Sequence, residues 1–231
     1  MKRVVVPELL DQDAGTPAEI DASLADLRWL NAWFGGWSTT TALLWRIAKE
    51  RGLCNLSYLD VAGASADGAQ AARDSLKHRG VEMEAAVLDR SHRHLPRGRS
   101  PHASNGIAVV CGDALALPFA DNSFDICGAS LFAHHLEPDE LIAFAEEALR
   151  VCRVAVILND LRRSRLHLAT AIAGRLLYRS RITRHDSAAS VRRAYTCEEL
   201  AGIFARLRGV RIEITRHYFF RAGVVLWKPL S

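Results

Sequence analysis

The chain has 231 residues, of which 49% are apolar and 24% charged, and its mean hydropathy is close to zero. These values exclude a disordered chain, and the length allows one large α/β domain with a substantial core. The formal net charge is only +4, and no finger motif or basic stripe interleaved with aromatic residues accompanies it. We therefore expect no nucleic-acid partner.

Targeting signals and cysteine chemistry are also excluded by the pattern of residues. No apolar run approaches the roughly 18 residues that span a bilayer, and residues 1–7 lack the apolar core of a signal peptide. We expect a cytoplasmic protein.

The five cysteines are Cys54, Cys111, Cys127, Cys152 and Cys197. They are scattered and form no Cys-x-x-Cys pair, which predicts reduced, mostly buried thiols and no metal site.

Two helices are predicted before the first strand. Thr16 and Glu19 have the spacing of a capping box, with Pro17 at the first helical position, and apolar residues then recur at helical spacing as far as Gly35. A second helix fits residues 38–51, with Gly52 as its left-handed cap. These helices form an N-terminal prefix over residues 1–52.

From residue 55 onward, short apolar strands alternate with helices, which predicts βαβ units and a mostly parallel sheet. The predicted strands cover residues 56–61, 83–88, 107–110, 124–130 and 151–158. Helices are predicted near residues 68–79 and 138–150. The stretch 91–105, rich in His, Arg, Pro and Ser, is expected to be an exposed loop.

The basic charge is concentrated in one segment near the end of the chain. Ten arginines and two acids lie between Arg153 and Arg193, so the rest of the chain is net acidic. An amphipathic helix is predicted over about residues 162–178, followed by a polar connection through residues 184–187. A helix at 196–207 and an antiparallel pair of edge strands at 210–215 and 218–227 complete a seven-stranded α/β architecture.

Small residues and acids follow the first three predicted strands. Asp60 is followed by Ala62, Gly63 and Ala64, and backbone can approach a ligand closely at such a strand-to-helix turn. Asp89 ends the second strand, where a carboxylate can accept hydrogen bonds from both hydroxyls of a ribose. An aspartate in the run from Gly112 to Asp125 can accept from the amino group of adenine, while Ala114 and Leu115 pack on the ring. The spacing predicts one adenosine site.

These motifs resemble those of the class I S-adenosylmethionine-dependent methyltransferases, especially the small-molecule branch with the ubiquinone and menaquinone C-methyltransferases. The matching segments are Leu59-Asp60-Val61-Ala62, Gly112-Asp113-Ala114 through Leu117-Pro118-Phe119, Ser123-Phe124-Asp125, and Leu131-Phe132-Ala133-His134-His135-Leu136. The resemblance covers residues 55–158 well and 195–227 loosely.

The resemblance implies a Rossmann-like fold, S-adenosyl-L-methionine as cofactor, and one methyltransferase domain over residues 1–231. Within that domain, residues 53–160 would form the cofactor-binding core, 161–195 a helical lid insert, and 196–231 the last helix and edge strands. The expected cofactor-binding residues are Asp60, Ala62, Gly63, Ala64, Asp89, Arg90, Gly112, Asp113, Ala114 and Ser130.

The cofactor loop departs from the family pattern. That pattern, D-V-x-x-G-x-G-D, has glycine where this chain has Ala64 and Ala66. A Cβ atom at a place where the backbone needs a positive φ costs about 1 kcal/mol. Three outcomes stay open: the cofactor sits shifted, it binds weakly, or these residues adopt an ordinary φ. A chain that kept the fold and lost the chemistry is a further alternative.

Three histidines are candidates for a general base. Methyl transfer is an in-line displacement that depends on positioning, but a phenol or enol attacks better as its anion, and a neutral histidine can take that proton. His134 and His135 follow the fourth strand, where they would line the pocket or only terminate the strand. His185, next to Asp186, lies in the segment expected to fold over the sheet edge, or on a solvated surface.

The acceptor is expected to be a hydrophobic small molecule. The arginine-rich helix at 162–178 would cap an apolar pocket or lie on an anionic membrane surface, with Leu161, Leu168, Ile172 and Leu176 on its apolar stripe. The N-terminal aromatics would form another wall or pack between helix and sheet. These aromatics are Trp29, Trp33, Phe34 and Trp37.

The function predicted from these features is O-methylation of a phenolic, enolic or carboxylic molecule by a monomer or homodimer. C-methylation of quinone type is the near variant. An NAD-dependent oxidoreductase would use the same strand-loop-helix turn, but Ala64 and Ala66 weaken the glycine fingerprint that it needs. A catalytically silent binding protein would have the same fold without methyl transfer.

Overall fold

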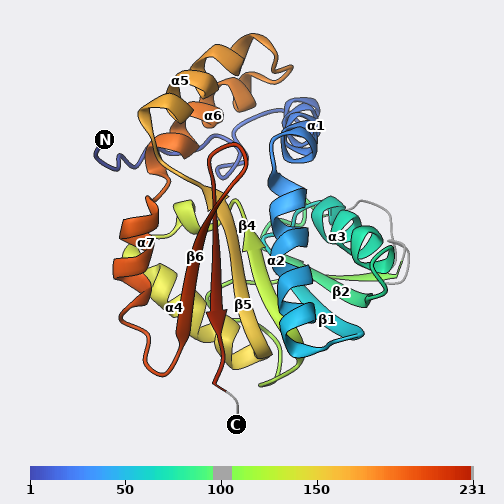
Figure 1. Ribbon diagram of the computed structural model, residues 1–231. Helices are drawn as coiled ribbons and strands as arrows, with labels where there is room; N and C mark the ends of the chain where they lie inside the picture. Colours follow the sequence, from blue (N-terminus) through green and yellow to red (C-terminus); the bar gives the residue numbers. More distant parts are fainter. Residues whose placement is uncertain (96–105, 230–231) are drawn as a thin grey trace.

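The computed structural model describes residues 1–95 and 106–229 of the chain, and one seven-stranded sheet organises them (Figure 1). The strands are β1 (Asn55–Val61), β2 (Glu82–Asp89), β3 (Ile107–Cys111), β4 (Phe124–Ser130), β5 (Cys152–Leu161), β6 (Arg211–His217) and β7 (Arg221–Trp227). Their order is β3-β2-β1-β4-β5-β7-β6. The first five run parallel, and β7 is antiparallel to both β5 and β6. The predicted sheet and its antiparallel pair are confirmed.

Helices cover both faces of the sheet and one of its ends. The helices are α1 (Pro17–Trp33), α2 (Gly36–Arg51), α3 (Asp67–Lys77), η1 (Ala133–His135), α4 (Pro138–Val151), α5 (Arg165–Ala173), η2 (Gly174–Leu176), α6 (Arg181–Arg193) and α7 (Cys197–Phe204). In Figure 1, α2 and α3 cover one face, and α4 and α7 cover the other. Helices α5 and α6 lie with α1 at the end of the sheet where the parallel strands finish.

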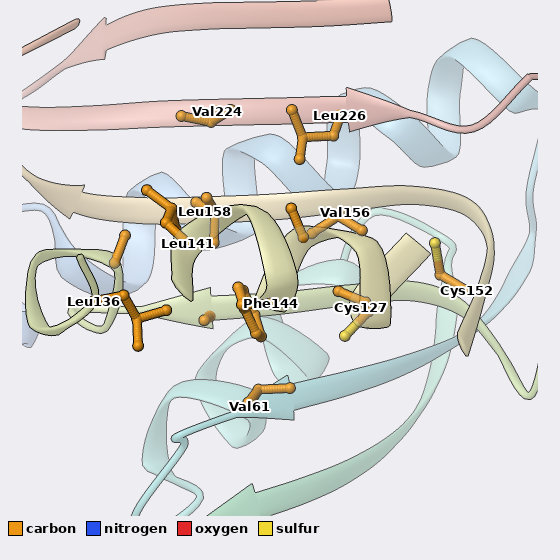
Figure 2. Packing of buried hydrophobic residues seen from close by; sticks show 14 of the residues in the cluster. Val61, Cys127, Leu136, Leu141, Phe144, Cys152, Val156, Leu158, Val224 and Leu226 are labelled. Carbon is orange, nitrogen blue, oxygen red and sulfur yellow. The ribbon is translucent and has the colours of Figure 1, made fainter. Parts of the chain in front are cut away.

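Alternating strand residues supply two apolar layers, one under each pair of helices. In β4, Cys127 points to the layer that contains Phe144 of α4, whereas Ile126 points to the layer that contains Leu44 of α2. Figure 2 shows the first layer, in which Phe144 packs beside Cys127. Because side chains of a strand alternate between its faces, strands buried on both faces read as continuous apolar runs.

Local sequence signals at helix ends behave as predicted. Thr16 accepts a hydrogen bond from the Glu19 amide while the Glu19 carboxylate accepts from the Thr16 amide, which is a complete capping box at the start of α1. Gly52 adopts the left-handed conformation at the end of α2, with φ of 64°. A second capping box joins Thr196 and Glu199 at the start of α7.

The lid segment differs from the prediction. The helix expected over residues 162–178 is shorter, because α5 ends at Ala173 and a 3-10 turn follows. The polar connection expected at residues 184–187 is wrong, since these residues lie inside the 13-residue helix α6. Its buried face uses small and polar residues such as Thr183, Ala189 and Ser190, so it lacks an obvious apolar stripe. Of the loop expected at 91–105, residues 96–105 lie outside the described part.

The burial of the cysteines agrees only in part with the prediction. Cys127 and Cys152 are buried, as expected, but Cys54 and Cys111 are exposed because each lies at an end or edge of the sheet. In the described ranges, no helix combines the length and apolarity needed to cross a bilayer.

Candidate functional site

A cavity of about 1110 Å³ lies at the carboxyl ends of the parallel strands. The strand order reverses between β1 and β4, and open α/β sheets bind ligands at such a reversal. All ten residues predicted to bind the cofactor line this cavity: Asp60, Ala62, Gly63, Ala64, Asp89, Arg90, Gly112, Asp113, Ala114 and Ser130. The volume exceeds that of most single-ligand pockets, so it has space for a donor and an acceptor together.

The loop after β1 holds three alanines in the left-handed conformation. Ala62, Ala64 and Ala66 have φ values of 57°, 44° and 65°. Gly63 does not have a positive φ, but a Cβ atom there would lie 2.9 Å from the carboxylate of Asp60 and 2.9 Å from Val87. The loop therefore keeps a strained shape despite its alanines, and the alternative that Ala64 and Ala66 adopt an ordinary φ is excluded.

Asp60 is a buried carboxylate at the end of β1. Burial raises its pKa to about 7, although the Tyr58 hydroxyl donates a hydrogen bond to Oδ1 at 3.2 Å. Among the described residues, no basic side chain lies within ion-pair distance of Asp60. A buried acid without a cationic partner is costly unless a ligand supplies the positive charge.

Acids also lie at the end of β2 and just after β3. Asp89 is buried, and its two oxygens accept hydrogen bonds from the amides of Ala64 at 3.1 Å and Ser91 at 2.9 Å. Asp113 is exposed to the cavity and accepts from the Leu115 amide at 2.9 Å. Carboxylate oxygens have lone pairs left for further donors in this geometry.

Asp125 lies away from this site. It follows the first residue of β4 and accepts hydrogen bonds from the amide and hydroxyl of Ser57 and from Arg153, and it does not line the cavity. Of the aspartates in the predicted adenine run, Asp113 is the one that the fold brings to the pocket.

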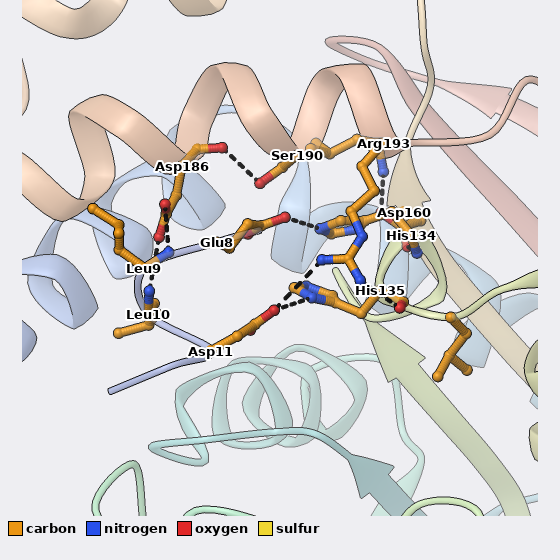
Figure 3. Close-up of polar contacts among 12 residues, drawn as sticks. Glu8, Leu9, Leu10, Asp11, His134, His135, Asp160, Asp186, Ser190 and Arg193 are labelled. Carbon is orange, nitrogen blue, oxygen red and sulfur yellow. Dashed lines mark hydrogen bonds and ion pairs between the residues drawn. The ribbon is translucent and has the colours of Figure 1, made fainter. Parts of the chain in front are cut away.

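His134 lies between two carboxylates in the cavity wall (Figure 3). Its Nδ1 is 2.7 Å from Asp160 Oδ1, its backbone amide donates to Asp160 Oδ2 at 2.9 Å, and its Nε2 is 3.5 Å from Glu8 Oε1. Burial opposes a charged ring, but Asp160 and Glu8 outweigh it and raise the pKa of His134 to about 10. In this form the ring is protonated at neutral pH and does not accept a further proton.

The other two candidate histidines differ in placement. His135 lines the cavity, and its Nδ1 lies 2.7 Å from Asp11 Oδ2. His185 does not line the cavity; its half-exposed ring lies beside Asp186 at 2.8 Å. The structure therefore brings His134 and His135 to the pocket and leaves His185 outside it.

The N-terminal segment, residues 1–15, is a functional element that the sequence pattern did not indicate. The amides of Leu9 and Leu10 donate to the carboxylate of Asp186 on α6 at 2.9 and 3.0 Å. These contacts hold the segment over the sheet edge, so Glu8 and Asp11 line the cavity. The segment has no helical or strand periodicity, which leaves no local signal from which its position follows.

His167 and Arg221 are two further cavity residues that the sequence did not single out. His167, on α5, donates a hydrogen bond from Nδ1 to the Arg162 carbonyl at 3.0 Å. Burial, together with the charges of Arg221 and Arg162, lowers the pKa of His167 to about 4. The ring is then neutral, so Nδ1 carries the proton and Nε2 is an acceptor without a partner among the described residues. Its face stacks on Phe220, with centroids 4.8 Å apart.

Arg221 places a positive charge in the same region. Its side chain is 3% exposed, and burial lowers its pKa to about 10. It donates to Asn31 Oδ1 at 3.0 Å, and no carboxylate of the described residues lies within ion-pair distance. Such a site favours a bound group that carries negative charge.

Apolar walls complete the cavity. Trp29, Phe34 and Trp37 line it. Of the two roles predicted for the N-terminal aromatics, these three have the role of a pocket wall. Trp33 does not line the cavity, because its side chain is 68% exposed. On the lid, Ala171 and Leu177 line the cavity, as does Leu161 of the predicted stripe. The other stripe residues do not: Leu168 is half-buried, whereas Ile172 near the end of α5 and Leu176 in η2 are exposed to solvent.

Comparisons with known proteins agree with this arrangement. A family described as a methyltransferase domain matches residues 59–158. Over 112 residues the chain is 38% identical to an uncharacterized methyltransferase of Mycolicibacterium gilvum. This alignment covers 48% of this chain and 40% of that protein. Over 101 residues it is 41% identical to the ubiquinone/menaquinone biosynthesis C-methyltransferase UbiE of Dinoroseobacter shibae. This alignment covers 41% of this chain and 37% of that protein. The matches thus span about two fifths of these curated relatives.

A solved structure shares the fold over nearly the full chain. The plantazolicin methyltransferase BpumL, in complex with a monoazolic desmethylPZN analog and SAH, aligns with a TM-score of 0.64 at 11% identity, over 95% of this chain and 91% of that one. The domain match, the two relatives and the strand order support a class I S-adenosylmethionine-dependent methyltransferase, with the family match covering residues 59–158.

Proposed function

We propose that this chain transfers the methyl group of S-adenosyl-L-methionine to a hydrophobic phenolic, enolic or carboxylic small molecule, most simply at oxygen. The observation that carries the proposal is a single cavity with two unlike halves. The acids at the ends of β1 and β2 and after β3 line one half, and aromatic side chains with a neutral histidine and a buried arginine line the other.

The donor half fits an adenosyl sulfonium. Asp89 would accept from the ribose hydroxyls and Asp113 from the adenine amino group, while Ala114 and Leu115 pack on the ring. Asp60 lacks a cationic partner, and the ammonium and sulfonium of the donor would supply that charge. The donor supplies an electrophilic methyl group when bound, and the protein has to hold the acceptor oxygen in line with it.

The acceptor half suits an acidic hydroxyl or a carboxylate. His167 Nε2 would accept a hydrogen bond from the hydroxyl, and Arg221 would stabilise the negative charge that develops on its oxygen. His134 and His135, the bases expected from the sequence, lie in the same cavity, but His134 already carries a proton between Asp160 and Glu8. We therefore place the hydrogen bond to the hydroxyl of the acceptor at His167, whose ring is neutral.

C-methylation is the second candidate, because one relative is named a ubiquinone/menaquinone biosynthesis C-methyltransferase. The same donor half would serve it, and an activated ring carbon would then take the place of the oxygen.

We also propose that residues 1–231 act as one methyltransferase domain. The N-terminal segment, α1 and α5 all contribute cavity residues outside the stretch matched by the family.

A thermal shift experiment tests donor binding. S-adenosylmethionine and S-adenosylhomocysteine are expected to stabilise the protein, by about 2.7 kcal/mol at one hundred times the dissociation constant, and NAD is not. Asp89→Ala should abolish the shift, whereas Asp74→Ala, at an exposed position on α3, should keep it. A shift with NAD alone would favour the oxidoreductase, and no shift with any ligand would favour a silent protein.

Product analysis tests the acceptor. Labelled methyl donor is offered with a panel of alkylphenols, enols, long-chain carboxylic acids and hydroquinones, and the position of the label is read by NMR. Methoxy or methyl-ester signals are expected. Label found only on ring carbon would replace O-methylation by C-methylation and leave the donor assignment intact.

A further inference from the structure

We propose that Glu8, His134 and His135 form a binding site for one divalent transition-metal ion in the cavity wall. One ligand atom from each residue lies within 4.8 Å of those from the other two. Glu8 comes from the N-terminal segment, and both histidines come from η1 after β4 (Figure 3). All three line the cavity.

Both histidines have the surroundings of metal ligands. His134 Nδ1 lies 2.7 Å from Asp160 Oδ1, and His135 Nδ1 lies 2.7 Å from Asp11 Oδ2. A histidine that binds a metal generally donates its other ring N–H to a carboxylate or carbonyl, which fixes the tautomer and the ring orientation. Here each Nδ1 is held by a carboxylate, so an ion would bind at Nε2 and replace the 3.5 Å contact between His134 and Glu8.

Glu8 gives an independent observation. Its side chain is buried, and Oε1 finds no hydrogen-bond donor among the described residues. The nearest basic atom, His134 Nε2, is 3.5 Å away, which is too long for a good hydrogen bond. An unsatisfied buried carboxylate oxygen costs free energy, and a bound cation would remove that cost.

The charges around the cluster leave room for a cation. Glu8, Asp11 and Asp160 are the acids. The basic groups that face them are Arg193, 3.6 Å from Asp11, the buried Arg221, whose charge acts on Asp160, and the two histidines. An incoming ion has to replace the 3.5 Å ion pair between His134 and Glu8, so we expect moderate affinity.

The ligand set selects the class of metal. Two imidazoles and one carboxylate suit Zn²⁺, Mn²⁺, Fe²⁺ and Co²⁺, whereas Mg²⁺ and Ca²⁺ prefer oxygen ligands alone. Three protein ligands leave at least one coordination position open, as in catalytic metal sites. That position faces the cavity, where it would take an oxygen of the acceptor. Only this last point rests on the proposed methyl transfer; the metal site does not.

Metal binding to the full chain tests the site. The protein is purified without a polyhistidine tag, treated with a chelator, and titrated with Co²⁺ while visible absorption is recorded, and with Zn²⁺ and Mn²⁺ by calorimetry. One ion per chain is expected, with Mg²⁺ binding far more weakly. Glu8→Gln and His135→Asn should each weaken binding more than tenfold, and Asp11→Asn by about ten- to hundredfold.

Two controls separate loss of the site from loss of the fold. His78→Asn, at an exposed histidine after α3, should bind Co²⁺ like the unchanged protein. Each cluster variant should keep its thermal shift with S-adenosylhomocysteine, which reports the donor half alone. Equal Co²⁺ affinity in the unchanged protein and in Glu8→Gln, or binding no tighter than that of Mg²⁺, would overturn the metal site without affecting the donor assignment.

Discussion

Asp60 illustrates how one residue links the fold to ligand charge. Strand β1 carries it to the sheet edge, where apolar neighbours exclude water and raise its pKa to about 7. An uncharged carboxyl attracts a sulfonium weakly, whereas a carboxylate attracts it strongly. The charge of this one group is therefore expected to control donor binding near neutral pH.

The affinity for S-adenosylmethionine should increase about tenfold between pH 6 and pH 8, because the carboxyl with its pKa near 7 ionises over this range. Calorimetry across the range measures it. Methylthioadenosine, which lacks the ammonium and the sulfonium, serves as the matched ligand and should show a much flatter profile. Parallel profiles for the two ligands, or an unchanged profile in Asp60→Asn, would contradict this role.

His167 makes a second prediction at the residue scale. His167→Asn keeps a donor near the Nδ1 position for the Arg162 carbonyl but removes the Nε2 acceptor. We expect kcat with a hydroxyl acceptor to fall by about five- to tenfold, because one hydrogen bond to the attacking oxygen, worth about 1 kcal/mol, is lost. His167→Gln, whose amide oxygen reaches toward the Nε2 position, should retain more activity.

Binding of S-adenosylhomocysteine separates the two causes of such a loss. Both His167 variants should bind it like the unchanged protein, because the ring contacts no predicted cofactor residue. Full turnover by His167→Asn would remove the residue from the chemistry.

At the scale of elements, the loop between β1 and α3 has a left-handed backbone at three alanines, where glycine would be less strained. Ala62, Ala64 and Ala66 all have a positive φ, which costs about 1 kcal/mol for each non-glycine residue. Ala66 also buries its methyl group among the apolar residues under α3, whereas Ala64 does not. The two positions should therefore respond differently to glycine.

Ala64→Gly should raise the free energy of unfolding by up to about 1 kcal/mol, because relief of the left-handed strain exceeds the added entropy of the unfolded chain. Ala66→Gly should be close to neutral, since the lost burial of one methyl group, about 0.8 kcal/mol, offsets the same relief. Urea unfolding of both variants measures the difference. Destabilisation by Ala64→Gly would contradict the strained loop.

At the scale of the whole molecule, the α5–η2 part of the lid leaves apolar side chains exposed to solvent beside the cavity. Leu166, Leu176 and Leu177 of the α5–η2 region are exposed, and Leu176 is 92% exposed. Arg175 lies in the same turn, and arginines with exposed apolar residues favour an anionic lipid surface. A hydrophobic acceptor taken from a membrane would enter the cavity from this side.

Vesicle sedimentation checks this contact. The protein should sediment with vesicles that contain an anionic phospholipid more than with neutral ones, and added salt should reduce the effect. The double variant Leu166→Ser and Leu176→Ser should sediment less, while Ala143→Ser, at an exposed position on α4 away from the lid, is the comparison. Equal sedimentation with anionic and neutral vesicles would remove the membrane contact.

Local signals were sufficient for much of the fold. The capping boxes at Thr16 and Thr196 and the left-handed Gly52 are interactions between residues close in sequence, and the strands were found because parallel strands buried on both faces are apolar throughout. The lid was placed less well. Helix α6 buries small and polar residues against α1, so its stability comes from tertiary contacts that no periodicity reveals.

The donor half of the cavity was determined by the sequence itself, because β1, β2 and β3 are adjacent parallel strands and their ends bring Asp60, Asp89 and Asp113 to one edge. The acceptor half was decided only by the tertiary structure. Glu8, His134 and His167 lie far apart in the chain, and long-range contacts such as that of Leu9 with Asp186 bring them together. Local patterns encode which element a residue joins, whereas packing between elements determines which side chains share a cavity.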